Sequence, residues 1–296
     1  MTPIPPKLVA EVGCNHMGNM QIAHDFIKIA ASFCKVRYIK FQKRTPRELL
    51  TPEQYNAPHP VPANSYGRTY GEHRERLEFT RDQHQQLKEW CEEEGLIYFS
   101  SVWDLSAARD IVSLGPELIK VPSAVNTNLD LLRYLTDEFG GQIHLSLGMT
   151  TRQEEEAIIE ELQGRGRLKD TVLYACTSGY PVPFQEVYLL EIQRLLADYG
   201  SMVDAIGFSG HHLGIAVDIA AYTLGATWIE RHFTLDRTWK GTDHAASLEP
   251  DGLRRLQRDL FNTYEAMRAR EHEISPIEHA QREKLKWRPR VTVEKS

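Results

Sequence analysis

Two histidines stand where neighbouring apolar runs of the chain come to an end. Residues 204–208 lead into Ser209 and His211, and residues 226–229 lead into Glu230 and His232. The apolar, alanine-rich segment between the two runs is long enough for one helix, which indicates a strand–helix–strand unit. Adjacent parallel strands lie roughly 5 Å apart, so the two imidazoles are close enough to share a metal ion. Imidazole suits Zn, Mn, Fe or Co, and two protein nitrogens leave positions open for water and a substrate oxygen.

Lysines and serines end other apolar runs of the chain. The lysines are Lys40 and Lys120, and the serines are Ser101, Ser123, Ser146, Ser178 and Ser209. Ammonium groups combined with hydroxyls and backbone N–H groups make a site for a dianion such as phosphate. Any one of these residues alone is also explained as a turn serine or a solvated lysine, but their shared position at strand exits favours an anion site.

Three further polar residues are candidates for the same site. Glu11 is the acidic residue of the first apolar run, where it could orient a water molecule or accept a proton, or else form an ion pair with Lys40 or Lys120. Gln42 has the same strand parity as Lys40 and therefore points the same way. Asp243 follows the last run and either binds sugar hydroxyls or is a turn residue.

Eight apolar runs alternate with helical patterns, and this order must position the polar residues. The runs are 8–12, 38–39, 96–99, 118–119, 143–145, 172–174, 204–208 and 226–229. Strand and helix alternating eight times predict an α/β protein with a (β/α)8 barrel, in which the chemistry lies at the carboxyl ends of the strands. We expect one barrel domain over residues 1–285 and a tail over 286–296.

Two local patterns refine this prediction. Residues 47–78 are too long for a plain connection, and because they follow the second run they are expected to overhang the barrel mouth. Thr150 and Gln153 have the spacing of a capping box and predict the start of a helix.

Composition limits the class of protein. The 296 residues are 41% hydrophobic and 26% charged, which is ordinary for a globular chain, and the net charge of −6 argues against nucleic-acid binding. No apolar run reaches the roughly 20 residues of a membrane span, and the N-terminus lacks the apolar centre of a signal peptide. The 4 cysteines show no CxxC spacing, so a reduced, cytoplasmic protein is expected.

Several segments resemble the sialic acid synthase family. They are residues 10–16, 39–42, 145–149, 176–181, 230–236 and 239–250, while 66–74 and 77–79 are similar to the branch that holds the animal N-acylneuraminate-9-phosphate synthases. The resemblance implies a (β/α)8 barrel that condenses phosphoenolpyruvate with an aldose such as N-acetylmannosamine or its 6-phosphate. The product would be a 3-deoxy-2-ulosonic (nonulosonic) acid, released with phosphate.

The resemblance also implies roles for individual residues. His211 and His232 would hold a divalent metal, Mn²⁺ in most of the family, with Mg²⁺ or Co²⁺ as alternatives. Gln42 and Asp243 would bind the acceptor sugar, and Glu11 would lie beside the reacting carbons and orient the attacking water. The residues that would bind phosphoenolpyruvate are Lys40, Ser101, Lys120, Ser123, Ser146, Ser178, Tyr180 and Ser209.

The chain departs from the family pattern at acceptor contacts. Val125 stands where the family has an acidic residue, residues 101–103 read Ser-Val-Trp in place of Thr-Pro-Phe, and Leu147 replaces a threonine. The resemblance ends near Lys286, where the family usually continues into an antifreeze-like domain. We therefore expect a retained reaction with a changed acceptor, which could be an aldose without an N-acyl group. The family tends to form homodimers.

Two other functions remain open from the sequence. One is a different metal-dependent barrel enzyme, such as a class II aldolase or a sugar isomerase. The other is a non-catalytic barrel that binds a sugar phosphate. The retained lysines and histidines favour a catalyst, because binding alone requires no metal.

Overall fold

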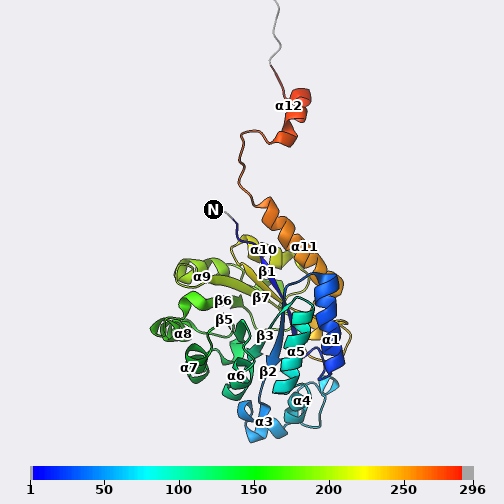
Figure 1. Cartoon of the computed structure of the whole chain (residues 1–296), viewed down its shortest axis with the longest axis vertical. Coiled ribbons are helices and arrows are strands. Elements are labelled where there is room, and N and C mark those ends of the chain that lie inside the picture. The colour runs from blue at the N-terminus through cyan, green and yellow to red at the C-terminus, as the bar shows by residue number, and fades with distance from the viewer. Residues whose placement is uncertain (1–2, 289–296) are drawn as a thin grey trace, which may run out of the picture.

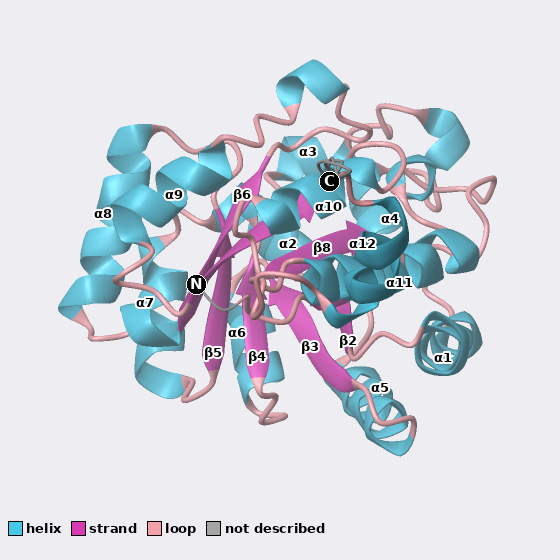
Figure 2. Cartoon of the chain, turned by 90° about the horizontal axis from the view of Figure 1, so that it is seen from above, coloured by secondary structure: helices cyan, strands magenta, loops and turns pink. Residues whose placement is uncertain are grey.

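Eight parallel strands pair in chain order, and the last pairs with the first to close a barrel. The computed structural model describes residues 3–288. The strands lie at the centre with helices around them (Figures 1 and 2), which confirms the predicted (β/α)8 fold. The strands are β1 (Lys7–Gly13), β2 (Tyr38–Lys43), β3 (Ile97–Val102), β4 (Leu118–Val121), β5 (Gln142–Ser146), β6 (Thr171–Cys176), β7 (Ala205–Gly210) and β8 (Trp228–His232).

The outer helices pack apolar faces against the strands. The helices of the main ring are α1 (Met20–Ile29), α5 (Arg81–Glu93), α6 (Leu105–Val112), α7 (Leu129–Glu138), α8 (Arg152–Gly164), α9 (Glu191–Tyr199), α10 (Ala216–Thr223) and α11 (Pro250–Ala266). A π-helical turn, Ala30–Cys34, extends α1. The first turn of α8 corrects one prediction, because its capping box joins Thr151 to Glu154 instead of Thr150 to Gln153. Thr150 instead accepts from Asn126 and donates to the Gly148 carbonyl.

Strand parity separates a closed apolar layer inside the barrel from the polar mouth. The inner layer holds the buried side chains Val9, Phe99, Leu118, Val172, Tyr174 and Trp228. Side chains two residues further along a strand point the same way. Glu11, Ser101, Lys120, Cys176 and Glu230 therefore also face the barrel axis, one layer closer to the carboxyl ends. Apolar packing on one side of this layer forces its polar groups to face one another or a ligand.

The segment after β2 overhangs the mouth, as predicted. It contains α2 (Pro46–Leu49), α3 (Pro52–Asn56) and α4 (Tyr70–Arg76), which lie together at one end of the barrel in Figure 1. Arg44 and Glu78 close the base of this insertion, because the backbone N–H and Nε of Arg44 donate to the two Glu78 carboxylate oxygens at 2.8 and 2.6 Å. The insertion is thus anchored beside the strand that carries Lys40.

Beyond α11 the chain leads to α12 (His279–Leu285), which lies away from the barrel in Figure 1. Of the tail expected over residues 286–296, positions 289–296 lie outside the described residues. Within residues 3–288, no helix combines the length and the apolar character that crossing a membrane requires.

Candidate active site

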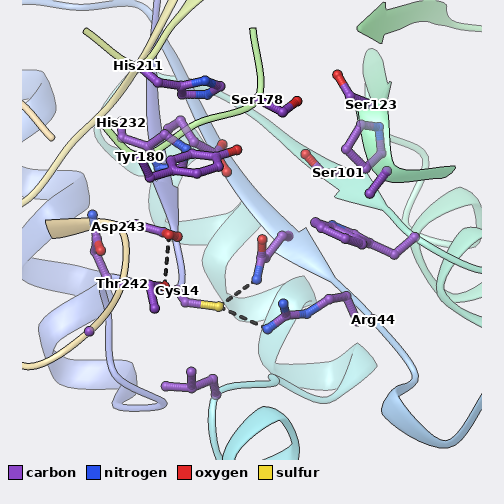
Figure 3. Close-up of a pocket in the computed structure, with 18 of the residues that line it drawn as sticks. Cys14, Arg44, Ser101, Ser123, Ser178, Tyr180, His211, His232, Thr242 and Asp243 are labelled. Atoms are coloured by element: carbon purple, nitrogen blue, oxygen red, sulfur yellow. Dashed lines mark hydrogen bonds between the residues drawn. The ribbon is translucent and has the colours of Figure 1, made fainter. Parts of the chain in front are cut away.

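Every residue selected from the sequence lines one cavity of about 350 Å³ at the carboxyl ends of the strands. Figure 3 shows several of them converging, with His211, His232 and Tyr180 close together. The predicted residues in the cavity are Glu11, Lys40, Gln42, Ser101, Lys120, Ser123, Ser146, Ser178, Tyr180, Ser209, His211, His232 and Asp243. The two imidazoles and the two ammonium groups thus line the same cavity, as we expected from the sequence. Their individual chemical roles stay predictions.

Two lysines and two glutamates form a buried charge cluster at the base of the cavity. Lys40 Nζ lies 2.5 Å from a Glu11 carboxylate oxygen and 3.7 Å from Glu230, and Lys120 Nζ lies 3.2 Å from Glu230. Glu230 also accepts a hydrogen bond from Ser209 at 3.0 Å. The ion pair left open for Glu11 in the sequence is therefore present. Glu230 had no predicted role, although its parity with His232 places it in the mouth.

Burial and nearby charges shift the pKa values of Glu11 and Glu230 in opposite directions. Burial raises the pKa of Glu11 to about 8, because Lys40 offsets only part of the lost hydration and Glu230 opposes ionisation. Burial acts on Glu230 in the same direction, but Lys120 and Lys40 outweigh it and hold the pKa of Glu230 below its usual range. Glu230 is therefore the carboxyl group of the pair that ionises more readily.

Serine hydroxyls and a glycine form a cradle beside the lysines. Lys40 donates to Ser101 Oγ at 2.7 Å, and the backbone N–H of Gly148 donates to Ser123 Oγ at 3.0 Å. A Cβ built on Gly148 would lie 2.7 Å from both Ser123 Oγ and Ser178 Oγ. Glycine at position 148 therefore lets the two hydroxyls approach the backbone closely, and a larger residue would displace them.

The histidine pair lies at the outer edge of the cluster. The ring centroids of His211 and His232 are 5.4 Å apart, and the Tyr180 ring lies 4.4 Å from His211. His211 Nδ1 is 2.9 Å from the Thr177 carbonyl oxygen, which can only accept, so this contact places the proton on Nδ1 and makes Nε2 the candidate metal ligand. Burial lowers the pKa of His232 to about 4, which keeps that imidazole in its neutral, metal-binding form.

The surroundings of His232 suit a metal ion. Its buried Nδ1 has no hydrogen-bond partner within the described residues. Gly13, at φ +53°, lies in the space between three polar side chains: a Cβ there would be 3.2 Å from a Glu11 oxygen, 3.5 Å from His232 and 3.6 Å from Asp243. No third histidine, cysteine, aspartate or glutamate completes a ligand cluster among residues 3–288. Two imidazoles with other positions left open fit the metal site expected from the sequence, and the metal itself stays a prediction.

Comparison with known proteins assigns the chain to a family. Its sequence matches the NeuB family over residues 26–272. The chain belongs to the NeuB family. N-acetylneuraminate-9-phosphate synthase of Homo sapiens is 34% identical over 283 residues, which are 95% of this chain and 76% of that protein. N,N'-diacetyllegionaminic acid synthase of Campylobacter jejuni is 32% identical over 261 residues, 88% of this chain and 77% of that protein.

A solved structure agrees with this family. The crystal structure of N-acetylneuraminic acid (sialic acid) synthetase from Leptospira borgpetersenii, in complex with citrate, superposes with a TM-score of 0.79. It is 26% identical in sequence and covers 95% of this chain and 91% of its own. The predicted family is therefore confirmed, and this NeuB-family chain is a condensing enzyme of the sialic acid synthase type.

The outer part of the NeuB-family site holds residues that the sequence did not single out. Arg74 and Lys240 line the same cavity from the β2 insertion and from the segment after β8. Arg74 donates to the Tyr70 hydroxyl at 2.7 Å, and Lys240 Nζ lies 4.8 Å from the Tyr66 ring centroid. Within residues 3–288 neither cation forms an ion pair with a carboxylate. No sequence spacing could have joined residues so far apart in the chain.

A second charged group lies behind the histidines, away from the cavity. Asp218 and Arg231 are fully buried and form an ion pair at 2.5 Å. Arg231 also donates to the carbonyl oxygens of His212 and Gly214, at 2.6 and 2.8 Å. His212 is therefore structural, and the group fixes the backbone that follows His211.

Proposed function

We propose that this chain condenses phosphoenolpyruvate with a phosphorylated aldose to give a 3-deoxy-2-ulosonic acid of the sialic type and inorganic phosphate. The observation that carries the proposal is the cluster of Lys40 and Lys120 with serine hydroxyls, placed directly beside the His211–His232 pair. An anionic enol and a carbonyl acceptor thus have adjoining sites. The family membership favours this reaction over the aldolase, isomerase and binding-only alternatives.

Phosphoenolpyruvate would bind at the inner end of the cavity. Its phosphate and carboxylate need several cationic and hydroxyl donors, which Lys40, Lys120 and the serine cradle around Gly148 supply. Each lysine ammonium group carries three N–H donors, so Lys40 and Lys120 can donate to this anion while they are paired with Glu230. Burial strengthens these contacts, because little water competes for them.

The bond changes follow from this arrangement. C3 of phosphoenolpyruvate attacks the aldehyde carbon of the acceptor, whose oxygen becomes an alkoxide and takes up the proton that the water of the next step releases. Water then adds at C2, and Glu11, ionised, accepts a proton from that water. The tetrahedral C2 centre collapses as its bond to the phosphate oxygen breaks, and the C2 hydroxyl gives its proton to the departing phosphate, which leaves the 2-keto acid. Lys40, 2.5 Å from Glu11, stabilises the ionised carboxylate that this step requires.

His211 and His232 would hold the divalent ion, for which Mn²⁺ is our first candidate and Mg²⁺ or Co²⁺ are alternatives. The unpartnered Nδ1 of His232 and the carbonyl-oriented ring of His211 support this assignment. When bound, such an ion supplies Lewis-acid polarisation of the acceptor carbonyl. Gln42 and Asp243 would bind acceptor hydroxyls beside it. A cytoplasmic homodimer is the setting that the free cysteines and the family suggest.

The acceptor's phosphate is proposed to contact Arg74 and Lys240. Both are cationic, both line the outer cavity, and neither is neutralised by a carboxylate within residues 3–288. The human relative is named for a 9-phosphate product, which requires a phosphorylated acceptor. Guanidinium and ammonium groups are the usual partners of a phosphate.

A phosphate-release assay tests this proposal. We expect turnover of phosphoenolpyruvate and Mn²⁺ with N-acetylmannosamine 6-phosphate, and a lower kcat/KM with the unphosphorylated sugar. Arg74→Ala and Lys240→Ala should each raise the KM for the phosphorylated acceptor by about tenfold to a hundredfold. Arg68→Ala is the matched control, because Arg68 lies on the same insertion, outside the cavity, and pairs with Glu72. Equal turnover of both sugars would contradict the phosphate assignment.

A further inference from the structure

The ammonium group of Lys120 lies on the face of an aromatic ring, next to the buried charge cluster. Its Nζ is 3.3 Å from the centroid of the Tyr174 ring and 3.2 Å from a Glu230 carboxylate oxygen. Lys120 and Tyr174 are both buried, so little water competes with the ring for the cation. A desolvated ammonium group is attracted by the electron density of such a ring face. The ring is therefore a partner of this cation in addition to the carboxylate.

A chain of hydrogen bonds holds the Tyr174 ring on the side away from the mouth. Asp204 accepts from Nε2 of Gln142 at 2.8 Å, so it is the Gln142 carbonyl oxygen that lies 3.0 Å from His144 Nε2. That oxygen can only accept, and burial lowers the pKa of His144 well below its usual value, so the neutral imidazole carries its proton on Nε2. The Tyr174 hydroxyl then donates to His144 Nδ1 at 2.8 Å. The hydroxyl is thus directed to His144, and the ring face is left for Lys120.

The neighbouring strand leaves room for this ring. Gly207 on β7 is the register partner of Tyr174, and a Cβ built on Gly207 would lie 2.7 Å from the ring carbon Cε1. A larger side chain at position 207 would therefore displace the ring. Tyr174 also packs within the closed apolar layer of the barrel. The position of the ring is thus fixed by its surroundings and does not depend on Lys120.

We propose that Tyr174 is a positioning residue, which holds the Lys120 ammonium group in place for the anionic enol substrate. The inference rests on the proposed function, because Lys120 must bind phosphoenolpyruvate for its position to matter. An ammonium group has three N–H donors. Glu230 accepts from one, the ring face takes a second, and the third is left for the substrate. Without the ring, Lys120 is free to move away from the substrate.

Fluorinated phenylalanines at position 174 test this role. Tyr174→Phe keeps the ring, and each added ring fluorine withdraws electron density from its face with little change of shape. We would measure the Kd for phosphoenolpyruvate by calorimetry with Mn²⁺ present. We expect the Kd to rise stepwise from the unfluorinated to the trifluorinated ring, by about tenfold in total, while the KM for the acceptor stays constant. A Kd that is flat across the series would overturn the proposal, because packing alone does not depend on the electron density of the ring.

The same fluorinated series at Phe99 is the matched control. Phe99 belongs to the same buried layer, but its ring neighbours His144, with 5.5 Å between the centroids. The Kd for phosphoenolpyruvate should stay constant along the Phe99 series. A rise as large as that of the Tyr174 series would show a general effect of fluorine in the barrel and would overturn the proposal.

If Tyr174→Phe fails to fold, the wild-type protein still decides by NMR of ¹³C-labelled lysine, with Mg²⁺ as the metal. The methylene signals of Lys120, assigned by their absence from Lys120→Arg, should be shifted upfield by the ring current and should move again when phosphoenolpyruvate is added. Signals at ordinary lysine positions would refute the contact.

The failure of the proposed function is distinguishable from the failure of this inference. A wild-type protein that neither binds phosphoenolpyruvate nor releases phosphate from it would refute the proposed function. Ordinary binding and turnover in the wild type, together with a flat fluorinated series, would refute only the positioning role of Tyr174.

Discussion

Glu11 and Lys40 are register partners on the neighbouring strands β1 and β2, and their side chains meet as an ion pair of 2.5 Å within the barrel mouth. Both side chains are about 95% buried. This pair joins the proposed proton acceptor to one of the proposed phosphoenolpyruvate ligands. A change at either residue should therefore alter both binding and proton transfer.

The Lys120–Glu230 pair predicts separable effects on stability and binding. Lys120→Met leaves Glu230 with only the more distant Lys40, so we expect a loss of about 3–5 kcal/mol of unfolding free energy. The KM for phosphoenolpyruvate should also rise, by about tenfold to a hundredfold. Adding Glu230→Gln should restore most of the stability but not the KM. Urea unfolding and initial rates measure the two effects, and an unchanged KM in Lys120→Met would exclude Lys120 from the phosphoenolpyruvate site.

The raised pKa of Glu11 predicts the pH dependence of the reaction. Glu11 must be ionised to accept a proton, and its pKa is raised from 4.5 to about 8, so the active fraction increases as the pH rises through that value. A plot of kcat/KM against pH reports groups of the free enzyme. We expect an acid limb with an apparent pKa near 8 that belongs to the coupled Glu11–Glu230 pair. An acid limb near 4.5 would show that Glu11 is not desolvated as described.

The buried Asp218–Arg231 pair predicts a large structural effect far from the substrates. Asp218→Asn removes one charge of a pair with no exposed side-chain surface, which should cost about 3–5 kcal/mol of unfolding free energy. Asp251→Asn is the control, because its pairs with Arg254 and Arg255 are exposed to solvent and should each be worth less than about 1 kcal/mol. Urea unfolding compares them, and similar stabilities for the two variants would contradict this difference.

Metal removal tests the histidine pair. We expect a chelator to abolish phosphate release and added Mn²⁺ to restore it, while His211→Ala and His232→Ala lose Mn²⁺ binding measured by calorimetry. His24→Ala is the control, since His24 stacks on Trp90 at 4.3 Å and lies outside the cavity. Undiminished Mn²⁺ binding in both active-site variants would place the metal elsewhere.

The strands and most of the site were predictable because they follow local rules. Apolar runs that end in polar residues marked all eight strands, and parity along a strand placed Lys40 with Gln42. The capping box was displaced by one residue because two threonines are adjacent and either could begin the helix. The role of Glu230 depends on two lysines from other strands, so its own segment carries no sign of it.

Features that are built from loops could not be predicted from the sequence. Arg74 and Lys240 come together only through the folding of the insertion against the segment after β8, where the Tyr66 hydroxyl donates to the Lys240 carbonyl oxygen. The second cavity, lined by Leu49 and Leu50 of the insertion and by Val125 after β4, likewise depends on how separate segments pack. Hydrophobic periodicity does not specify how such irregular segments pack.

The central claim is a condensation in which phosphate leaves with its bridging oxygen. The most direct measurement is turnover in ¹⁸O-labelled water with phosphoenolpyruvate, Mn²⁺ and N-acetylmannosamine 6-phosphate, followed by mass spectrometry. We predict unlabelled phosphate, because water adds at C2, and an organic product whose composition equals both substrates plus water minus phosphoric acid. Labelled phosphate with free pyruvate, or no consumption of phosphoenolpyruvate, would contradict the account.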